Sequence, residues 1–132
     1  MSFDSHCHLT ADAFDEDREA VLERAREAGV QGMVCIASTP EDARRALGLS
    51  RAHPDLWCTA GLHPHESGSA ADGWEGAVRR LLSEPGVVAV GECGLDFHYD
   101  FAPRDVQLRV LAAQVEMAAE FDLPLVVHAR SA

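Results

Sequence analysis

Apolar segments and amphipathic segments alternate along the whole chain. Five segments, most of them apolar, predict β-strands at residues 2–8, 31–37, 56–62, 87–92 and 124–128. Four segments between them carry apolar residues at helical spacing and predict helices at residues 15–28, 40–52, 74–83 and 104–121. The predicted strands are apolar on both sides rather than alternating, which is typical of a parallel sheet covered by helices.

Local signals support these helices. Acidic residues at 15–17 suit the first turn of the first helix, and Gly29 is expected to stop it. Ser38 or Thr39 can cap the second helix, with Pro40 at its first position. In the last helix we expect one face to be apolar. That face contains Leu108, Leu111, Val115 and Ala118.

The order of elements predicts part of a TIM-type (β/α)8 barrel, an α/β fold. Strict alternation of strand and helix is the pattern of this fold, but a full barrel has eight strands and about 250 residues. Five strands and four helices in a single domain, residues 1–132, would supply an N-terminal portion. The first and fifth strands would then be open edges. We therefore expect a complementing C-terminal half, self-association or an open sheet.

Composition is that of a soluble globular protein. Hydrophobic residues make up 47% of the chain, and no apolar run is long enough to cross a bilayer. The N-terminus lacks the basic and apolar regions of a signal peptide, so a cytoplasmic location is expected. The four cysteines show no Cys-x-x-Cys spacing, and we expect reduced, buried thiols rather than a zinc site.

The charged residues restrict the chemistry. The net charge is −11, and all 11 basic residues are arginine. Without lysine no Schiff base can form, and any ligand that bridges two metal ions must be a carboxylate. The negative charge argues against broad nonspecific binding to nucleic acid, but not against a local site where metal ions supply positive charge.

Residues that can bind metal follow several of the predicted strands. His6 and His8 lie two apart on the first strand, so both imidazoles point to one side. Glu92 follows an apolar run between glycines, and His128 ends the last strand. Because active sites of such barrels lie at the carboxyl ends of the strands, we predict one metal site from these four residues. Asp4 is expected to orient an imidazole. The alternatives are two N-terminal histidines on a polar sheet end that bind no metal, a core histidine at position 128 whose hydrogen bonds are satisfied within the protein, and a salt bridge from Glu92 to an arginine.

Four further residues are candidates at the same end of the sheet. His63 is predicted to be catalytic, contacting the substrate or its leaving group, and Glu92 is the second catalytic candidate. His65, Asp96 and Arg130 are predicted to bind substrate, Arg130 through a phosphate. The alternatives are a loop histidine without a role for His65 and an ion pair for Arg130.

At these residues the chain resembles the TatD family of metal-dependent deoxyribonucleases, which are amidohydrolase-like TIM barrels. The resemblance covers residues 3–130. It is carried by DSHCHL at 4–9, GLHPH at 61–65, GECGLDFHYD at 91–100, Gln107 and Gln114, and LPLVVHAR at 123–130.

The resemblance implies two divalent ions, Mg²⁺, Mn²⁺ or Zn²⁺. It places His6 and His8 on the first ion, Glu92 between the two, and His128 on the second. It also implies hydrolysis of phosphodiester bonds in DNA, single-stranded or at 3′ ends. The family has a further His and a metal-binding Asp on later strands, and these would lie beyond residue 132. Two alternatives remain: a metal-dependent hydrolase of esters, including aminoacyl esters, or of amides, and a truncated fragment without catalysis.

Overall fold

The structure, a computed structural model that describes residues 1–132, contains one parallel sheet with strands in the order β1-β2-β3-β4-β5. The strands are β1 Ser2–Cys7, β2 Val30–Cys35, β3 Leu56–Ala60, β4 Val87–Asp96 and β5 Leu125–Arg130. The helices between them are α1 Arg18–Glu27, α2 Pro40–Ala52, α3 Trp74–Leu82 and α4 Arg104–Phe121, with short 3-10 helices η1 Asp12–Phe14 and η2 Pro64–Ser69. The predicted βα order is confirmed.

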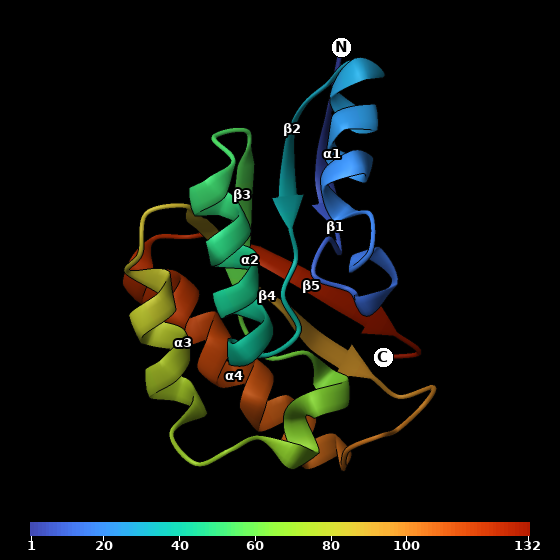
Figure 1. The fold of residues 1–132 in the computed structure, drawn as a ribbon. Coiled ribbons are helices and arrows are strands. Elements are labelled where there is room, and N and C mark those ends of the chain that lie inside the picture. The colour runs from blue at the N-terminus through green and yellow to red at the C-terminus, as the bar shows by residue number, and fades with distance from the viewer.

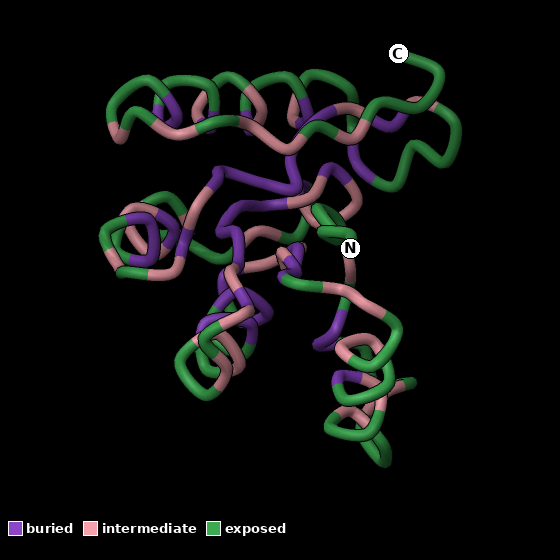
Figure 2. The backbone as a smooth tube through the Cα atoms, turned by 90° about the horizontal axis from the view of Figure 1, so that it is seen from above, coloured by how far each residue is buried: buried purple, intermediate pink, exposed green.

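The sheet curls, and the helices cover its outer side (Figure 1). Seen from above, buried residues gather on the central strands of the sheet, and the helices lie around the outside (Figure 2). All four strand pairs are parallel and join neighbours in the sequence. This is the arrangement of a partial (β/α)8 barrel, as the sequence predicts, and it brings the carboxyl ends of all five strands to one mouth.

The core lies between the sheet and the helices. Apolar side chains from β2, β3, β4, α1, α2, α3 and α4 form one buried cluster. Its fully buried members include Leu22, Cys35, Cys58, Val78, Val90 and Met117. The four cysteines are free thiols, and three of them are buried. Burial raises the pKa of Cys58 to about 12 and that of Cys93 to about 11.

Strand burial follows position in the sheet. Central strands β3 and β4 are almost wholly buried, whereas the edge strands β1 and β5 contain no buried residue. Phe3 on β1 is 54% exposed and Val127 on β5 is 57% exposed. The two open edges that the sequence predicts are therefore present. None of the helices combines the length and the apolar character that a membrane span needs.

Two helix predictions need correction. The first helix begins at Arg18 rather than at residue 15, because residues 12–14 form a separate 3-10 turn. In α4 the predicted apolar face is wrong, since Leu108 and Val115 are about half exposed. The buried face instead contains Gln107, Val110, Gln114, Met117 and Ala118. Two buried glutamines therefore replace leucine and valine against the sheet, and they bond to the ends of β3 and β4.

The fourth strand is longer than predicted. It continues beyond Glu92 to Asp96, because residues 93–96 pair with residues 127–130 of β5. A register shift between Gly91 and Cys93 leaves Glu92 outside this ladder. The Glu92 amide instead donates to the carbonyl of Ala37 beyond the end of β2. Glu92 thus emerges within a strand at an irregularity that redirects its side chain, not at the strand end.

Candidate metal centre

Three of the four predicted ligands meet at the carboxylate of Glu92. The Nε2 atom of His6 lies 3.6 Å from its Oε2, and the Nδ1 atom of His128 lies 3.6 Å from its Oε1. His8 completes a group with His6 and Glu92 whose donor atoms all lie within 4.8 Å of one another. Each oxygen of one buried carboxylate therefore faces a different imidazole, an arrangement that suits two neighbouring cation sites.

Glycines allow β5 to approach β4 closely at this point. Gly91 and Gly94 have φ angles of +148° and +144°, which side chains rarely adopt. A Cβ atom on Gly94 would clash with the carbonyl oxygen of His128, and one on Gly91 would lie 2.5 Å from that of Val126. The glycines on either side of Glu92 thus permit the backbone packing that places His128 beside the carboxylate.

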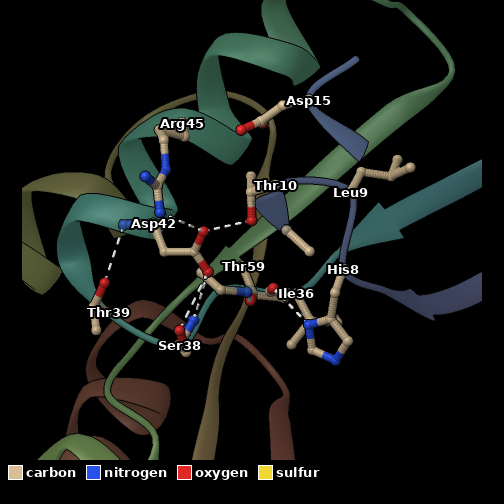
Figure 3. Close-up of polar contacts among 12 residues, drawn as sticks. His8, Leu9, Thr10, Asp15, Ile36, Ser38, Thr39, Asp42, Arg45 and Thr59 are labelled. Carbon is tan, nitrogen blue, oxygen red and sulfur yellow. Dashed lines mark hydrogen bonds and ion pairs between the residues drawn. The ribbon is translucent and has the colours of Figure 1, made fainter. Parts of the chain in front are cut away.

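The orientation of the His8 ring leaves one nitrogen free for the mouth. Its Nδ1 lies 3.3 Å from the carbonyl oxygen of Ile36, which can only accept, so Nδ1 carries the proton and donates (Figure 3). In the neutral ring Nε2 is then an unprotonated ligand atom. A backbone carbonyl that fixes the tautomer in this way is the usual arrangement around metal-binding histidines.

A buried carboxylate at the start of α2 holds the chain next to His8. Asp42 accepts hydrogen bonds from the hydroxyl of Thr10 and from the amide of Ser38, at 3.0 Å for the latter (Figure 3). Its own amide donates to the Thr39 hydroxyl at 3.1 Å, which caps the helix as predicted. The loop that follows His8 is thereby tied to the end of β2.

The segment from Ile36 to Ser38 carries no ligand but contacts three site residues through its backbone. The Ile36 carbonyl accepts from His8, the Ala37 carbonyl accepts from the amide of Glu92 at 2.9 Å, and the Ser38 carbonyl accepts from the amide of His63 at 2.9 Å. The Thr59 hydroxyl adds a fourth link, because it accepts from the Ala37 amide and donates to the Gly91 carbonyl.

Asp96 contacts the His128 ring on the side away from Glu92 and is shielded from solvent. Its side chain is 1% exposed, and Oδ2 accepts from Nε2 of His65 at 2.7 Å and from Nε2 of His128 at 2.9 Å. Its Oδ1 accepts from the amides of His98 and Tyr99. Burial by itself raises the pKa of Asp96, but the hydrogen bonds from the Tyr99 amide and the two imidazoles outweigh it and hold the pKa well below its usual range.

The contact with Asp96 sets the tautomer of His128. A carboxylate can only accept, so Nε2 of His128 carries a proton and donates to Asp96. The neutral ring then presents an unprotonated Nδ1 to Glu92, 3.6 Å away. The prediction that Asp96 contacts substrate does not fit these contacts, because both of its oxygens are already engaged inside the protein.

His63 is neutral and presents a donor. Its Nδ1 accepts from the amide of His65 at 3.1 Å, so the proton of the neutral ring is on Nε2. Burial, with smaller contributions from His65 and His128, lowers the pKa of His63 to about 4. His63 lines an open hollow without a hydrophobic residue in its wall. The lining residues are His8, Ser38, His63, His65, Glu66, Glu92 and His128.

The remaining predicted residues have different surroundings. Asp4 accepts from the backbone amide of His6 rather than from an imidazole, so its predicted role is wrong. Arg130 is exposed at the end of β5 and makes no ion pair; its guanidinium lies 5.0 Å from the centre of the Tyr99 ring. The alternative reading of Arg130, an ion pair with a carboxylate, is therefore not what the structure contains.

Two buried glutamines of α4 bond to the strand ends at the mouth. The Gln114 side chain accepts from the amide of Leu62 at 2.9 Å and donates to its carbonyl at 3.0 Å. Gln107 makes the same pair of bonds with the backbone of Asp96, at 2.8 and 3.1 Å. Sequence reasoning had no structural role for these side chains. The sequence signal for a shared role was their spacing. The two glutamines are seven residues, or two helical turns, apart, so they lie on the same face of a helix that packs against a sheet.

Comparison with known proteins shows an extended similarity. The model of the family described as TatD related DNase matches residues 3–132. A protein of Erwinia tasmaniensis named 3′-5′ ssDNA/RNA exonuclease TatD is 43% identical over 131 residues, and its counterpart in Salmonella typhimurium is 42% identical over 130. Each alignment covers 98% of this chain. The chain spans about half the length of the curated relatives it matches, 51% and 50% for these two.

Solved structures agree with this similarity. The crystal structure of YJJV, a TatD homologue from Escherichia coli, superposes with a TM-score of 0.92 and 34% identity, covering 98% of this chain and 51% of that one. A TatD family hydrolase from Entamoeba histolytica superposes with a TM-score of 0.90 at 23% identity, over 98% of this chain and 50% of that one. The second likeness concerns the fold alone.

Proposed function

This chain belongs to the TatD-related DNase family, and from that membership we propose that its mouth is part of a metal-dependent nuclease centre that hydrolyses phosphodiester bonds in DNA. One observation carries the proposal: the two oxygens of Glu92 each face an imidazole at 3.6 Å, one from β1 and one from β5. The relatives named as 3′-5′ ssDNA/RNA exonucleases suggest single strands and 3′ ends as the substrate.

The donor set fits divalent ions. His8 and His128 are each held by a hydrogen bond that leaves one nitrogen unprotonated toward the mouth, and Glu92 offers both oxygens. We propose that His6, His8 and Glu92 hold one ion and that Glu92 and His128 hold a second. Mg²⁺, Mn²⁺ and Zn²⁺ all accept nitrogen and oxygen donors of this kind. When bound, such ions would supply positive charge to the phosphoryl group and lower the pKa of water.

The side chains around the ligands have separate tasks. Asp96 orients His128 and keeps its proton on Nε2. His63 presents a neutral Nε2–H to the hollow and can donate a hydrogen bond to the phosphate or to the leaving oxygen. His65 donates to Asp96, so we assign it to the support of that carboxylate rather than to direct contact with substrate. Arg130, free of any ion pair, is the residue best suited to a phosphate oxygen.

The centre is expected to gain donors from outside this chain. The chain spans about half of its relatives, and both edge strands β1 and β5 are exposed. We propose that residues 1–132 form one domain whose open edges are completed by a C-terminal half or by a second copy. We also propose a cytoplasmic setting, which the four free cysteines support because thiols persist in reducing compartments.

The test combines metal binding with cleavage. Calorimetry with Mn²⁺ or Zn²⁺ is expected to show binding that Glu92→Gln lowers at least tenfold, while circular dichroism stays unchanged. Single-stranded DNA labelled at its 5′ end would be incubated with each ion beside a panel of carboxylic esters, aminoacyl esters and amides. Cleavage of DNA that Glu92→Gln abolishes supports the proposal. The exposed Glu41→Gln is the matched control, since its carboxylate contacts only Arg44.

Other outcomes separate the alternatives. Turnover of an ester or amide without cleavage of DNA would keep the metal centre and replace the substrate. Failure of the wild-type chain to bind any of the ions would refute the centre. Metal binding without turnover of any substrate would favour a fragment that acts only when completed, and mixing with a C-terminal half would then be expected to restore cleavage.

A further inference from the structure

Two aromatic rings are exposed beside the mouth, in the segment 97–103 between β4 and α4. The rings of Tyr99 and Phe101 are stacked, with centroids 5.2 Å apart and planes 6° from parallel. Tyr99 is 49% exposed and Phe101 is 63% exposed. Large apolar side chains are normally removed from water when a neighbour can cover them. A stacked pair left open to solvent offers a flat apolar surface to a planar ligand.

One side chain connects this pair to the proposed metal centre. The His65 ring stands edge-on to both rings, 4.8 Å from Phe101 and 5.7 Å from Tyr99. Its Nε2 donates to Asp96, which also accepts from the proposed ligand His128. The exposed rings and the metal donors are therefore parts of one continuous surface, separated by a single imidazole.

A free cation lies on the same surface. Nine of the eleven arginines form an ion pair, which is expected in a chain with twice as many acidic as basic residues. Arg130 forms none, and its guanidinium lies over the Tyr99 ring. The neighbouring Asp100 is engaged by Arg104 at 3.2 Å, so it does not neutralise Arg130. A guanidinium on an aromatic ring retains its hydrogen-bond donors for a phosphate.

We propose that Tyr99, Phe101 and Arg130 form a nucleotide-holding surface, on which a base of single-stranded DNA stacks and a backbone phosphate binds beside the metal centre. The proposal rests on the proposed function, because it takes DNA as the substrate. A single strand is the occupant that fits, since the faces of its bases are accessible whereas those of a duplex are covered by their neighbours. The free arginine matches the negative backbone, and the aromatic pair matches any base.

The single tyrosine of the chain allows a direct measurement. Protein labelled with meta-fluorotyrosine gives one fluorine resonance, from Tyr99, and this is followed by NMR while a short oligodeoxyadenylate is added in EDTA. Stacked bases are expected to shift the resonance through their ring currents, and an abasic strand of equal length is expected to leave it nearly unchanged. Because EDTA removes divalent ions, the measurement does not depend on the metal centre.

Two variants separate the aromatic and ionic contributions. Phe101→Leu keeps an apolar side chain but removes the ring, and is expected to weaken binding of the oligodeoxyadenylate about fivefold or more, without effect on the abasic strand. Arg130→Gln is expected to weaken binding of both strands to a similar degree and to reduce the salt dependence. Phe3→Leu and Arg80→Gln are the matched controls: Phe3 is an exposed ring remote from the mouth, and Arg80 is the other arginine without an ion pair.

The surface is refuted if the fluorine resonance does not move, if the abasic strand moves it as far as the oligodeoxyadenylate, or if Phe101→Leu binds both strands as the wild type does. The first two results need no variant, so they hold even if Phe101→Leu fails to fold. Cleavage of DNA with Mn²⁺ is measured separately. Base-dependent binding without cleavage, also after a C-terminal half is added, would refute the proposed nuclease and keep the surface, whereas cleavage with base-independent binding would do the reverse.

Discussion

Replacing Asp96 by asparagine is expected to weaken metal binding by changing the tautomer of His128. In the wild type, Oδ2 of Asp96 accepts hydrogen bonds from Nε2 of both His65 and His128, while Oδ1 accepts from two backbone amides. In Asp96→Asn the amide oxygen can keep the two backbone donors, and the NH₂ group then faces the two imidazoles. Two donors cannot share a hydrogen bond, so each ring must present an unprotonated Nε2.

The change at Nε2 reaches the proposed metal site through the ring. A neutral imidazole that loses its proton from Nε2 carries it on Nδ1, the atom that lies 3.6 Å from Oε1 of Glu92. That nitrogen then has no free lone pair for a cation. Loss of such an orienting carboxylate usually lowers metal affinity about 10–100-fold, which corresponds to about 1.4–2.8 kcal/mol. A loss of metal affinity in this range is expected for Asp96→Asn, because the substitution otherwise preserves the shape and volume of the side chain.

The assay reads the tautomer and the affinity separately. Nitrogen NMR of the imidazoles in metal-free protein is expected to show His128 protonated on Nε2 in the wild type and on Nδ1 in Asp96→Asn. Calorimetry with Zn²⁺ gives the affinity, and Asp72→Asn in an exposed loop serves as the control. Unchanged affinity in Asp96→Asn, or an Nδ1 proton on His128 already present in the wild type, would contradict the reasoning.

Three further predictions concern stability and reactivity. Gln114→Leu is expected to lower the free energy of unfolding by about 2 kcal/mol or more in urea titrations, because it leaves the buried amide and carbonyl of Leu62 unpaired; a loss under about 0.5 kcal/mol would contradict this. Asp55→Asn is expected to cost about 0.2–1 kcal/mol at neutral pH. The hydrogen bond from Arg26 holds the pKa of Asp55 below its usual value, so the stability that Asp55 contributes must disappear as pH falls through that lowered pKa. A cost of Asp55→Asn that persists in acid would contradict this. Burial raises the pKa of Cys58 to about 12, so the three buried thiols are expected to react with a disulfide reagent only after unfolding, and their rapid reaction in the native protein would count against their burial.

The fold could be predicted from the sequence because several independent signals indicate the same order of strands and helices. Each apolar strand, each capping residue and each glycine stop adds independent support for the same βα order. The boundary errors come from competing local structure. Residues 15–17 have the acidic composition of a first helical turn, but residues 12–14 take the 3-10 turn and α1 begins after them, at Arg18. The Gly-Glu-Cys-Gly segment reads as a strand end, although pairing with β5 carries the strand onward to Asp96.

The convergence of the proposed metal donors could be predicted from topology alone, but their supports could not. Parallel strands bring their carboxyl ends together, so His6, Glu92 and His128 were expected to converge. The role of Asp96 depends on the length of β4. Asp96 lies beside His128 because the strand continues through residues 93–96, which pair with residues 127–130 of β5. Ending the strand at residue 92 placed Asp96 in a loop and suggested a contact with substrate instead.

The supports that sequence cannot reveal are those made by the backbone. The carbonyls of residues 36, 37 and 38 hold His8, Glu92 and His63, yet a carbonyl is present at every position and leaves no trace in the side-chain pattern. All of these bonds, together with the one that His128 donates to Asp96, lie within residues 1–132. The placement of His8, Glu92 and His128 therefore rests on bonds within these residues. Additional strands would contribute further ligands to a set that is already in place, and metal affinity measured on this chain should report on that preformed set.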